Sequence, residues 1–412
     1  MAKKLPCKQM RLYLCTWNVG GSKPDLDFTD VLDLQNSKHP DLYCIGLQEI
    51  DVQDLSLEEH PWSKALTACL GSRGYVRLKV RRMRGVMTIV FAKRTLLPYI
   101  TSIEAEATKT GFGGWWGNKG GASVRLDLFG MNLIIVNCHL AAHREKIQER
   151  IIDFDSILDN QKFKDEDVDN ILDHDYVFWM GDLNFRLEDL TYEEAIRHIE
   201  KGNLTKLLTY DQLKQCKEEG LIYEDFQEGR ITFPPTYKFD KGTDTYDTSK
   251  KKRVPAWCDR ILWHSYHESY GTVSLDVKQL DYRSHPKYRI SDHKPVTSQV
   301  DIQVFGKPPP SPVKFHMILK WYMSQASTLT YTMKAKSFST DWIGLYKADF
   351  RSFNEYVSYI YAEGGAEEHG DRGVMMEFPA SQVRVAAGHY VLCYLTKNYS
   401  LQGITNEFMI CP

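Results

Sequence analysis

A proline-rich segment near residue 310 divides the chain and limits how it can fold. Prolines occupy four of the five positions 308–312. Because proline lacks a backbone N–H and cannot continue a helix or a central strand, we expect residues 306–312 to form a stiff linker. The length of 412 residues also exceeds that of one ordinary domain. The sequence therefore predicts two domains, at residues 1–305 and 313–412.

The composition is typical of a soluble globular protein and limits its partners. Apolar residues make up 42% of the chain, and 52 basic residues nearly balance 54 acidic ones. With a net charge of −2, no global basic field exists to hold nucleic acid, so any anion must bind to a local cluster. No apolar run is long enough to span a membrane, and the N-terminus lacks a secretory apolar core. Nine cysteines without a C-x-x-C pair indicate reduced thiols and a cytosolic or cytosol-facing protein.

The first domain alternates short apolar runs with polar segments. Apolar side chains at helical spacing predict a helix over residues 144–160. The polar stretch between the first two apolar runs could be helical as well. These patterns predict an α/β or α+β domain around a mixed sheet. The expected strands are residues 12–16, 42–47, 86–91, 122–126, 133–137, 176–180, 260–263 and 294–297.

The second domain has a different composition. Residues 313–412 contain 17 aromatic side chains and no long helical periodicity. Short apolar runs, such as residues 388–395, are typical of strands. We therefore predict a small all-β domain.

Polar residues recur at the ends of the expected strands of the first domain. Any one of them could be a turn or cap residue, but strand ends gather at one edge of a sheet, so the series predicts a single site. Carboxylate and amide oxygens bind a hard cation such as Mg²⁺. A carboxylate can activate water, and a histidine held by an aspartate can stabilise charge on a phosphoryl group. The residues are Asn18, Glu49, His139, Asp182, Asn184, Asp259, Asp292 and His293.

Several catalytic motifs are absent or weak. The chain has neither a G-x-x-x-x-G-K-[ST] loop nor a G-x-S-x-G elbow. Residues 138–144 fit the C-x₅-R loop of cysteine-dependent phosphatases, but the segment contains no glycine with which to wrap a phosphate. We therefore interpret Cys138 as a packed thiol at a strand end. A metal chelator distinguishes the two mechanisms, because it should inhibit a Mg²⁺-dependent phosphatase and spare a cysteine-dependent one.

Residues 179–186 (WMGDLNFR) and 255–262 (PAWCDRIL) resemble the two signature blocks of inositol polyphosphate 5-phosphatases. The resemblance covers nearly all of residues 10–305, and it implies the four-layer α/β sandwich of the endonuclease/exonuclease/phosphatase fold. The tail resembles a SKICH domain at residues 341–346, 356–359 and 390–394, which implies a small all-β sandwich. Further matches to the phosphatases lie at residues 16–18, 48–49, 116–120, 137–142, 233–238 and 291–296.

The resemblance assigns catalytic roles by position. It implies Mg²⁺ bound by Glu49 with Asn18 beside it, and a water activated by Asp182 and positioned with help from Asn184. His139 and His293 would contact the scissile phosphate. Asp259 would orient His293, and Asp292 would support the geometry of the metal and the phosphate. Hydrolysis would be in line, without a covalent intermediate.

The resemblance also assigns substrate contacts. It implies 4-phosphate contacts from Tyr237, Lys238, Lys251 and Arg253, and 1-phosphate contacts from Asn118 and Lys119. Phe112 and Trp115 belong to a glycine-rich loop that could dip into lipid, although an ordinary loop explains them equally well.

The expected activity is Mg²⁺-dependent removal of the 5-phosphate from phosphatidylinositol 4,5-bisphosphate and the 3,4,5-trisphosphate, and from soluble inositol polyphosphates, at membrane surfaces. The resemblance implies a cytoplasmic protein, peripheral at the endoplasmic reticulum and plasma membrane, with an unidentified protein partner for the tail and no nucleic-acid ligand. Alternatives are a nuclease or phosphodiesterase of the same superfamily, or a non-catalytic membrane-recruited scaffold.

Overall fold

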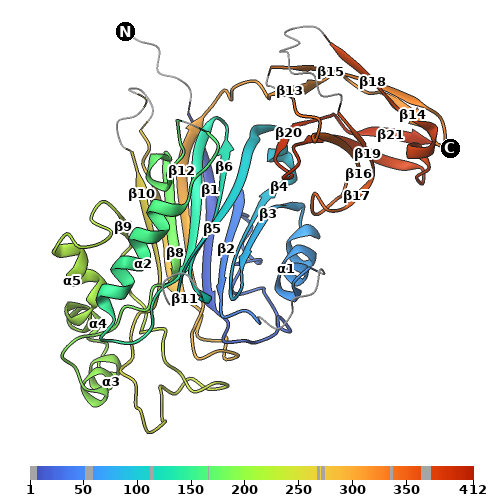
Figure 1. Cartoon of the computed structure of the whole chain (residues 1–412). Coiled ribbons are helices and arrows are strands. Elements are labelled where there is room, and N and C mark those ends of the chain that lie inside the picture. Colours follow the sequence, from blue (N-terminus) through green and yellow to red (C-terminus); the bar gives the residue numbers. More distant parts are fainter. Residues whose placement is uncertain are drawn as a thin grey trace.

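Two six-stranded sheets form the body of the first domain in the computed structural model (Figure 1). The structure describes residues 7–51, 59–111, 116–165, 167–266, 270, 274–334, 337–362 and 373–412. The first sheet has the order β11 (Lys278–Ser284), β12 (Val296–Phe305), β1 (Cys7–Asn18), β2 (Leu42–Gln48), β4 (Val86–Lys93), β3 (Tyr75–Met83). The second has the order β5 (Ile100–Gly111), β6 (Trp116–Leu128), β7 (Met131–His139), β8 (Tyr176–Asp182), β10 (Asp259–Ser265), β9 (Gln227–Glu228).

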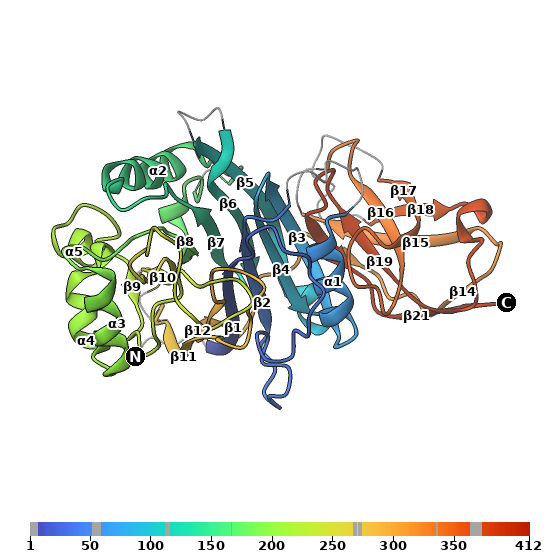
Figure 2. The same ribbon diagram turned by 90° about the horizontal axis from the view of Figure 1, so that it is seen from below.

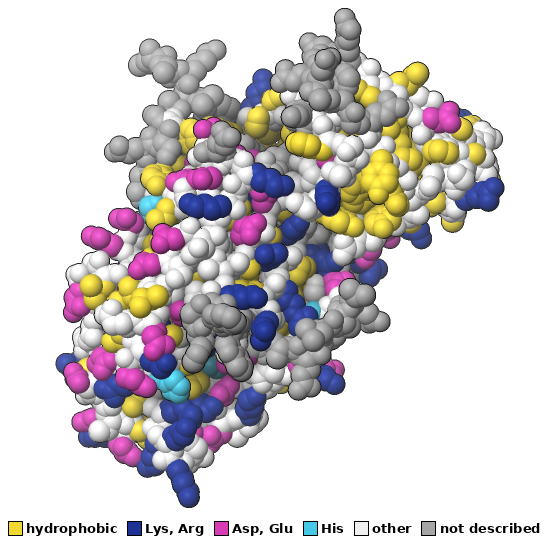
Figure 3. Space-filling model, viewed as in Figure 1, with side chains coloured by type: hydrophobic (Ala, Val, Ile, Leu, Met, Phe, Trp, Pro, Cys, Tyr) yellow, Lys and Arg dark blue, Asp and Glu magenta, His cyan; other side chains and the backbone are white. Residues whose placement is uncertain are grey.

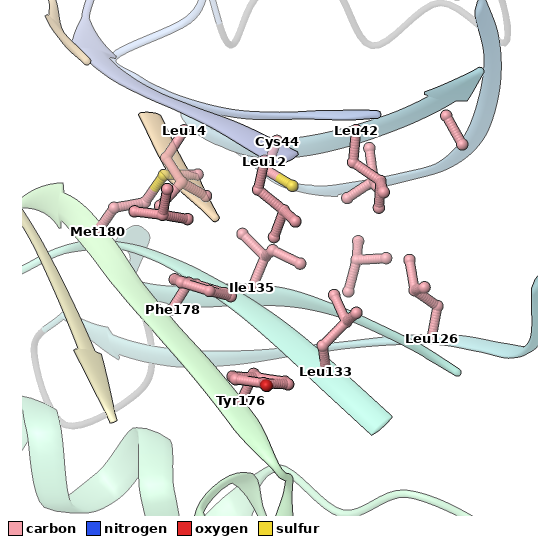
Figure 4. Packing of buried hydrophobic residues seen from close by; sticks show 14 of the residues in the cluster. Leu12, Leu14, Leu42, Cys44, Leu126, Leu133, Ile135, Tyr176, Phe178 and Met180 are labelled. Atoms are coloured by element: carbon pink, nitrogen blue, oxygen red, sulfur yellow. The ribbon is translucent and has the colours of Figure 1, made fainter. Parts of the chain in front are cut away.

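The two sheets pack face to face through a layer of aliphatic and aromatic side chains (Figure 4). Leu12 and Leu14 of β1 lie opposite Ile135, Phe178 and Met180 of the second sheet, and all five are buried. The central strands are buried on both faces because helices cover the outer faces. For this reason they read as continuous apolar runs rather than alternating ones.

Helices complete four layers (Figure 2). Trp62 and Leu66 of α1 (Pro61–Gly71) pack on the outer face of the first sheet. Phe154 and Ile157 of α2 (Ile147–Asn160) pack on the outer face of the second, as does Leu213 of α5 (Gln212–Glu218). This arrangement confirms the predicted four-layer sandwich. The remaining helices are α3 (Tyr192–Glu200), α4 (Leu204–Leu207) and the short 3₁₀ turns η1 (Arg94–Tyr99), η2 (Ile171–Asp173), η3 (Leu208–Tyr210) and η4 (Ala380–Val383).

The polar stretch between β1 and β2 is not helical, which corrects one expectation. Residues 19–41 form successive turns. The Asp27 carboxylate accepts the Thr29 N–H at 2.9 Å, and Asp33 adopts φ +50°. Aspartate side chains compete for nearby backbone N–H groups and so favour turns over a helix.

The C-terminal part is an all-β sandwich, as expected. One sheet has the order β13 (Val313–Phe315), β15 (Ser327–Met333), β18 (Val374–Phe378). The larger sheet has the order β14 (Lys320–Tyr322), β21 (Phe408–Cys411), β19 (Gly388–Leu395), β16 (Trp342–Lys347), β17 (Tyr356–Tyr361), and β20 (Leu401–Ile404) pairs with β19. Their shared core includes Trp321, Tyr331 and Phe378.

The C-terminal sandwich packs directly on the first domain. The Arg77 N–H donates to the carbonyl of Arg351 at 2.8 Å, and the Arg77 guanidinium donates to Ser352 Oγ at 2.9 Å. The Ser400 hydroxyl accepts the Ile103 N–H at 2.8 Å. Phe350 and other buried residues of the sandwich belong to the same apolar cluster as the inter-sheet core. The two parts therefore share one continuous core.

No helix in the described part of the chain combines the length and the apolar character that a membrane-spanning helix requires.

Candidate active site

Strand pairing brings the predicted polar residues to one edge of the sandwich. β1 and β2 are parallel, with Asn18 opposite Gln48, so Glu49 follows directly beside Asn18. β7 and β8 are also parallel, with His139 opposite Asp182. β10 runs antiparallel to β8 and begins at Asp259, opposite Asp182. These strand ends from both sheets meet at one site.

Asp182 lies at the centre of this site and is almost fully buried. Its Oδ2 accepts the Asn18 amide N–H at 3.0 Å and lies 3.2 Å from His139 Nε2 and 3.8 Å from His293 Nε2. Burial alone would raise the pKa of Asp182, but the neighbouring His293, His139 and Lys119 lower it well below its usual range. The carboxylate is therefore ionised at neutral pH and can accept a proton or a hydrogen bond from water.

His293 is held by a buried carboxylate. Its Nδ1 lies 2.9 Å from Asp259 Oδ2, and that oxygen also accepts the Thr236 hydroxyl at 2.7 Å. Burial would lower the pKa of His293, but Asp259 and Asp182 raise it to about 9. The imidazole is thus protonated at neutral pH, with Nε2 directed toward Asp182 and free of Asp259.

The surroundings of His139 shift its pKa in the opposite direction from that of His293. Its Nε2 contacts Lys119 Nζ and lies 3.8 Å from Glu49 Oε1. Burial and the Lys119 charge lower the pKa of His139, and burial lowers the pKa of Lys119 to about 8. Two basic groups held together in this way attract an anion, because a bound phosphate would relieve their mutual repulsion.

Asn184 is fixed from three sides. Its backbone has φ +58°, and its N–H donates to Asp182 Oδ1 at 3.1 Å. Its side chain donates to the carbonyl of Leu140 at 3.0 Å and accepts from Arg186 Nη2 at 2.5 Å. The amide is therefore pre-oriented beside Asp182, where it can help to position a water.

Tyr237 is sandwiched between a guanidinium and an imidazole. Arg186 lies 4.2 Å above its ring, and the centroids of the Tyr237 and His293 rings are 4.4 Å apart. Lys238, the next residue, contacts the Asp292 carboxylate. Burial would raise the pKa of Asp292, whereas His293 and Lys238 lower it. Tyr237, Lys238 and Asp292 thus lie at the rim of the His293 site.

The remaining predicted substrate contacts lie on other segments, and of these Lys119 also contacts His139 beside Asp182. Arg253 donates to Asp247 Oδ2 at 3.2 Å, and the exposed Lys251 donates its backbone N–H to Ser249 Oγ at 3.3 Å. Asn118 and Lys119 line a cavity of about 1210 Å³ between β5 and α2. Phe112 and Trp115 lie outside the described residues.

Two sets of residues could hold a divalent cation. Oxygen and nitrogen atoms of Asp182, Asp259 and His293 lie within 4.8 Å of one another. However, Asp259 Oδ2 already bonds Thr236 and His293, and Asp259 Oδ1 lies 3.2 Å from His293 Nδ1. The Glu49 carboxylate is half exposed beside Asn18 and 3.8 Å from His139 Nε2. This open carboxylate, together with an amide oxygen, better matches the oxygen donors that Mg²⁺ prefers.

Cys138 does not have the features of a nucleophile. Its thiol is fully buried, accepts the Trp179 indole N–H at 3.1 Å and donates to the carbonyl of Met180 at 3.6 Å. Burial raises the pKa of this thiol. A thiolate is required for cysteine catalysis, so the site does not support that mechanism.

Three residues that contribute to the site were not assigned a role from the sequence. Arg186 holds Asn184 and Tyr237, and Thr236 donates to Asp259. The Ser291 hydroxyl donates to the carbonyl of Asn18 at 2.7 Å. All three lie inside the motif segments 179–186, 233–238 and 291–296. Their positions in those segments are the sequence feature that could have identified them as site residues.

Comparisons with known proteins agree with this geometry. Residues 15–299 match the Endonuclease/Exonuclease/phosphatase family 2, and residues 313–410 match the SKICH domain. The chain is 38% identical to mouse inositol polyphosphate 5-phosphatase K, over 97% of its own length and 90% of that protein. The chain belongs to the inositol polyphosphate 5-phosphatase family. Both resemblances seen in the sequence, and the expectation of an enzyme of this class, are confirmed.

Other members of the family extend this result. Human phosphatidylinositol 4,5-bisphosphate 5-phosphatase A is 39% identical over 97% of this chain, which spans 41% of that longer protein. The 5-phosphatase domain of SPsynaptojanin, solved with inositol (1,4)-bisphosphate and a calcium ion, is 34% identical with a TM-score of 0.65. It covers 73% of this chain, which covers 86% of that domain. A Cimex nitrophorin has a TM-score of 0.60 at 24% identity, which shows a shared fold alone.

Proposed function

We propose that this 5-phosphatase removes the 5-phosphate from phosphatidylinositol 4,5-bisphosphate, and also from phosphatidylinositol 3,4,5-trisphosphate and soluble inositol polyphosphates. The observation that carries the proposal is the convergence of Asn18, His139 and His293 on the ionised Asp182. This arrangement suits the hydrolysis of a phosphate ester. The name of the human relative, phosphatidylinositol 4,5-bisphosphate 5-phosphatase A, supports the choice of substrate.

The mechanism follows from the protonation states of the site. Asp182 and Asn184 orient a water for in-line attack on phosphorus, and Asp182 accepts a proton from it as the P–O5 bond breaks. Protonated His293 donates a hydrogen bond to a phosphoryl oxygen, while Asp259 keeps the imidazole charged and oriented. Lys119 adds positive charge on the other side of Asp182, and the neutral imidazole of His139 beside it can hydrogen-bond a phosphoryl oxygen. The departing inositol oxygen takes up a proton from solvent.

We propose Mg²⁺ as the cofactor, held by Glu49 with Asn18 beside it. An ion held there would supply positive charge for the phosphate during transfer. The donor chemistry supports this choice, since Glu49 offers an open carboxylate at the catalytic edge. The calcium ion in the SPsynaptojanin structure supports a divalent cation in the family.

Recognition of the other phosphates rests on basic residues around the site. We assign the 4-phosphate to Tyr237, Lys238, Lys251 and Arg253, and the 1-phosphate to Asn118 and Lys119. Inositol (1,4)-bisphosphate bound in the SPsynaptojanin domain carries these two phosphates and lacks the 5-phosphate, as a product would. Substrates without a 4-phosphate should therefore be poor.

We place the enzyme at cytoplasmic membrane surfaces, peripheral at the endoplasmic reticulum and plasma membrane. Phe112 and Trp115 would contact lipid, and the C-terminal domain would bind a protein partner. The near-neutral net charge of −2 argues against nucleic acid as a ligand.

The test is phosphate release from short-chain phosphatidylinositol 4,5-bisphosphate, first with Mg²⁺ and then with excess chelator. Release that depends on Mg²⁺ is the expected result. No release in either condition, from folded protein, would contradict the proposal and direct attention to a nuclease or scaffold function.

A further inference from the structure

The larger sheet of the C-terminal domain is covered on its outer face only in part. Trp342, Cys393 and Leu395 point from this face into the core shared with the phosphatase domain. Trp342 pairs directly with Tyr361 of β17, and directly paired residues share a face. Tyr361 is 62% exposed, so the same apolar face continues past the interdomain contact into solvent. Figure 3 shows hydrophobic side chains gathered on this part of the C-terminal domain.

Aromatic rings form a ladder on the uncovered part. The ring centroids of Tyr356 and Tyr359 are 5.5 Å apart, and those of Tyr359 and Tyr361 are 5.6 Å apart. Gly344 lies opposite Tyr359, and a side chain there would collide with the Trp342 ring, so glycine keeps the surface between the rings open. The resulting cavity measures about 260 Å³. It is lined by Thr340, Trp342, Tyr356, Tyr359, Tyr361, Lys397 and Tyr399.

β17 is also the end strand of its sheet among the described residues. Natural proteins blunt such edges with charged side chains, because an apolar edge can pair with another strand. The other sheet-end strands, β3, β5, β9, β11, β13, β14 and β18, each contain at least one Lys, Arg, Asp or Glu. β17 reads YVSYIY and contains none. Among the described strands at the ends of these sheet orders, β17 alone lacks that protection. β20, which pairs only with β19 outside this order, is also uncharged, but it packs against β5 and β13.

We propose that the β17 edge binds an extended peptide of a partner protein, which adds to the sheet as a further strand. Its main chain would bond the free edge of β17, and every second side chain, aliphatic or aromatic, would pack on Tyr359 and Tyr361. An acidic residue of the peptide would lie near Lys397, the one charged side chain among the described residues that line the cavity. The site lies outside the catalytic machinery, and the inference goes beyond the proposed phosphatase function.

The observations favour a peptide over other occupants. A cationic ligand would meet Lys397 and no carboxylate among the described residues of the cavity. A second folded copy of the chain needs an interface of about 1,200 Å² or more, whereas β17 is six residues long and its cavity is small. A single strand matches both the length of the edge and the spacing of the rings.

The experiment selects random short peptides from a display library on the full chain, with counter-selection on the Tyr361→Glu variant. Selected peptides should alternate apolar with polar residues. The synthetic peptide should bind the full chain in a fluorescence anisotropy titration, and Tyr361→Glu should weaken it by about tenfold or more. Met375→Glu is the matched control, since Met375 is 71% exposed on β18, away from the cavity. Phosphate release should be unchanged in both variants.

Backbone methylation of the peptide tests the mode of binding. N-methyl groups on one alternate set of residues would block the edge bonds and abolish binding. The same groups on the other set would face away and leave binding intact. Thermal unfolding checks that Tyr361→Glu is folded, and Tyr359→Thr serves as a second variant with the same expected loss.

Several results would overturn the proposal. They are the absence of peptides that survive counter-selection, equal effects of the two methylated sets, and equal binding by the Tyr361 and Met375 variants. Loss of binding to phosphatidylserine vesicles in Tyr361→Glu, with no peptide selected, would assign the surface to lipid. A dimer in sedimentation that Tyr361→Glu dissolves would assign it to a second copy.

Discussion

His293 Nδ1 and Asp259 Oδ2 are 2.9 Å apart in a fully buried contact, and this pair determines the charge of the catalytic imidazole. Asp259 is the first residue of β10, and His293 belongs to the turn before β12, so two separate segments must meet to form it. Asp182 reinforces the charge from the other side, 3.8 Å from Nε2. Activity should therefore follow the protonation of His293.

The pH dependence tests this relationship. His293 has a pKa raised to about 9, so its charged form is complete at neutral pH and is lost as the pH rises through about 9. The rate of phosphate release should fall over the same pH range, which gives the pH–rate profile an alkaline limb. Asp259→Asn removes the main stabilising charge, so the limb should move to lower pH and the rate at neutral pH should drop by about 10²–10⁴-fold. A pH–rate profile measures both, and an unmoved alkaline limb would contradict the assignment.

Asp182→Ala should abolish turnover with little loss of fold. Asp182 is the point on which Asn18, His139 and His293 converge, and no other described carboxylate occupies that position. Single-turnover phosphate release measures the loss, and circular dichroism and thermal unfolding measure the fold. A variant that retains activity would remove Asp182 from its role.

Glu49→Gln should raise the Mg²⁺ concentration needed for half-maximal activity by about tenfold or more, because a neutral amide attracts a hard cation less strongly. The measurement is a Mg²⁺ titration of phosphate release. Glu377→Gln on β18 is the matched control, as an exposed carboxylate in the other domain. Identical titrations for the wild type and Glu49→Gln would place the ion elsewhere, with the Asp182, Asp259 and His293 cluster as the next candidate.

Lys238→Ala should weaken use of phosphatidylinositol 4,5-bisphosphate, with an increase in KM and a nearly unchanged Mg²⁺ requirement. Lys238 contacts Asp292 at the rim of the site, where a 4-phosphate would compete for its charge. A substrate without the 4-phosphate should show a much smaller change. An unchanged KM for the 4,5-bisphosphate would refute the 4-phosphate assignment.

Phe350→Ala should destabilise the whole chain by about 3–5 kcal/mol, because Phe350 is buried in the core that both domains share. The ring centroids of Phe350 and Tyr346 are 4.7 Å apart, and Arg94 Cζ lies 5.8 Å from the centroid of the Phe350 ring. Chemical denaturation, followed both by fluorescence and by phosphate release, should show the two signals shifting together. Loss of only one signal would mean that the domains unfold independently.

The sequence predicted the strands that lead to the site because apolar runs and the polar residues after them are local patterns, whereas β3, β5 and β11 were not predicted. Asn18, His139 and Asp182 each follow an apolar run, and parallel pairing then brings them to one edge. The turns after β1 were harder to predict, since the bond from the Thr29 N–H to the Asp27 side chain and the positive φ of Asp33 exclude a helix there. The Arg186–Tyr237–His293 stack was not predictable at all, because it joins three segments through side-chain contacts that carry no sequence period.

The interdomain contact also could not be predicted from local sequence patterns. The proline-rich segment predicted a stiff linker, and the structure shows that Arg77 and Ile103 also bond directly to residues 351, 352 and 400 of the second domain. These contacts depend on residues more than 270 positions apart. Only the tertiary structure shows that the two domains pack together around one shared core.

The place of that contact determines the reach of the enzyme. Arg77 lies near the beginning of β3, whereas the turn that follows β3 bonds Ile50, next to Glu49, so the C-terminal sandwich is attached at the end of the sheet opposite the catalytic edge (Figure 1). Whatever holds the sandwich therefore also sets the height and tilt at which the catalytic edge meets its substrate. Different binding partners would give the same chemistry access to phosphates at different distances from the attachment point.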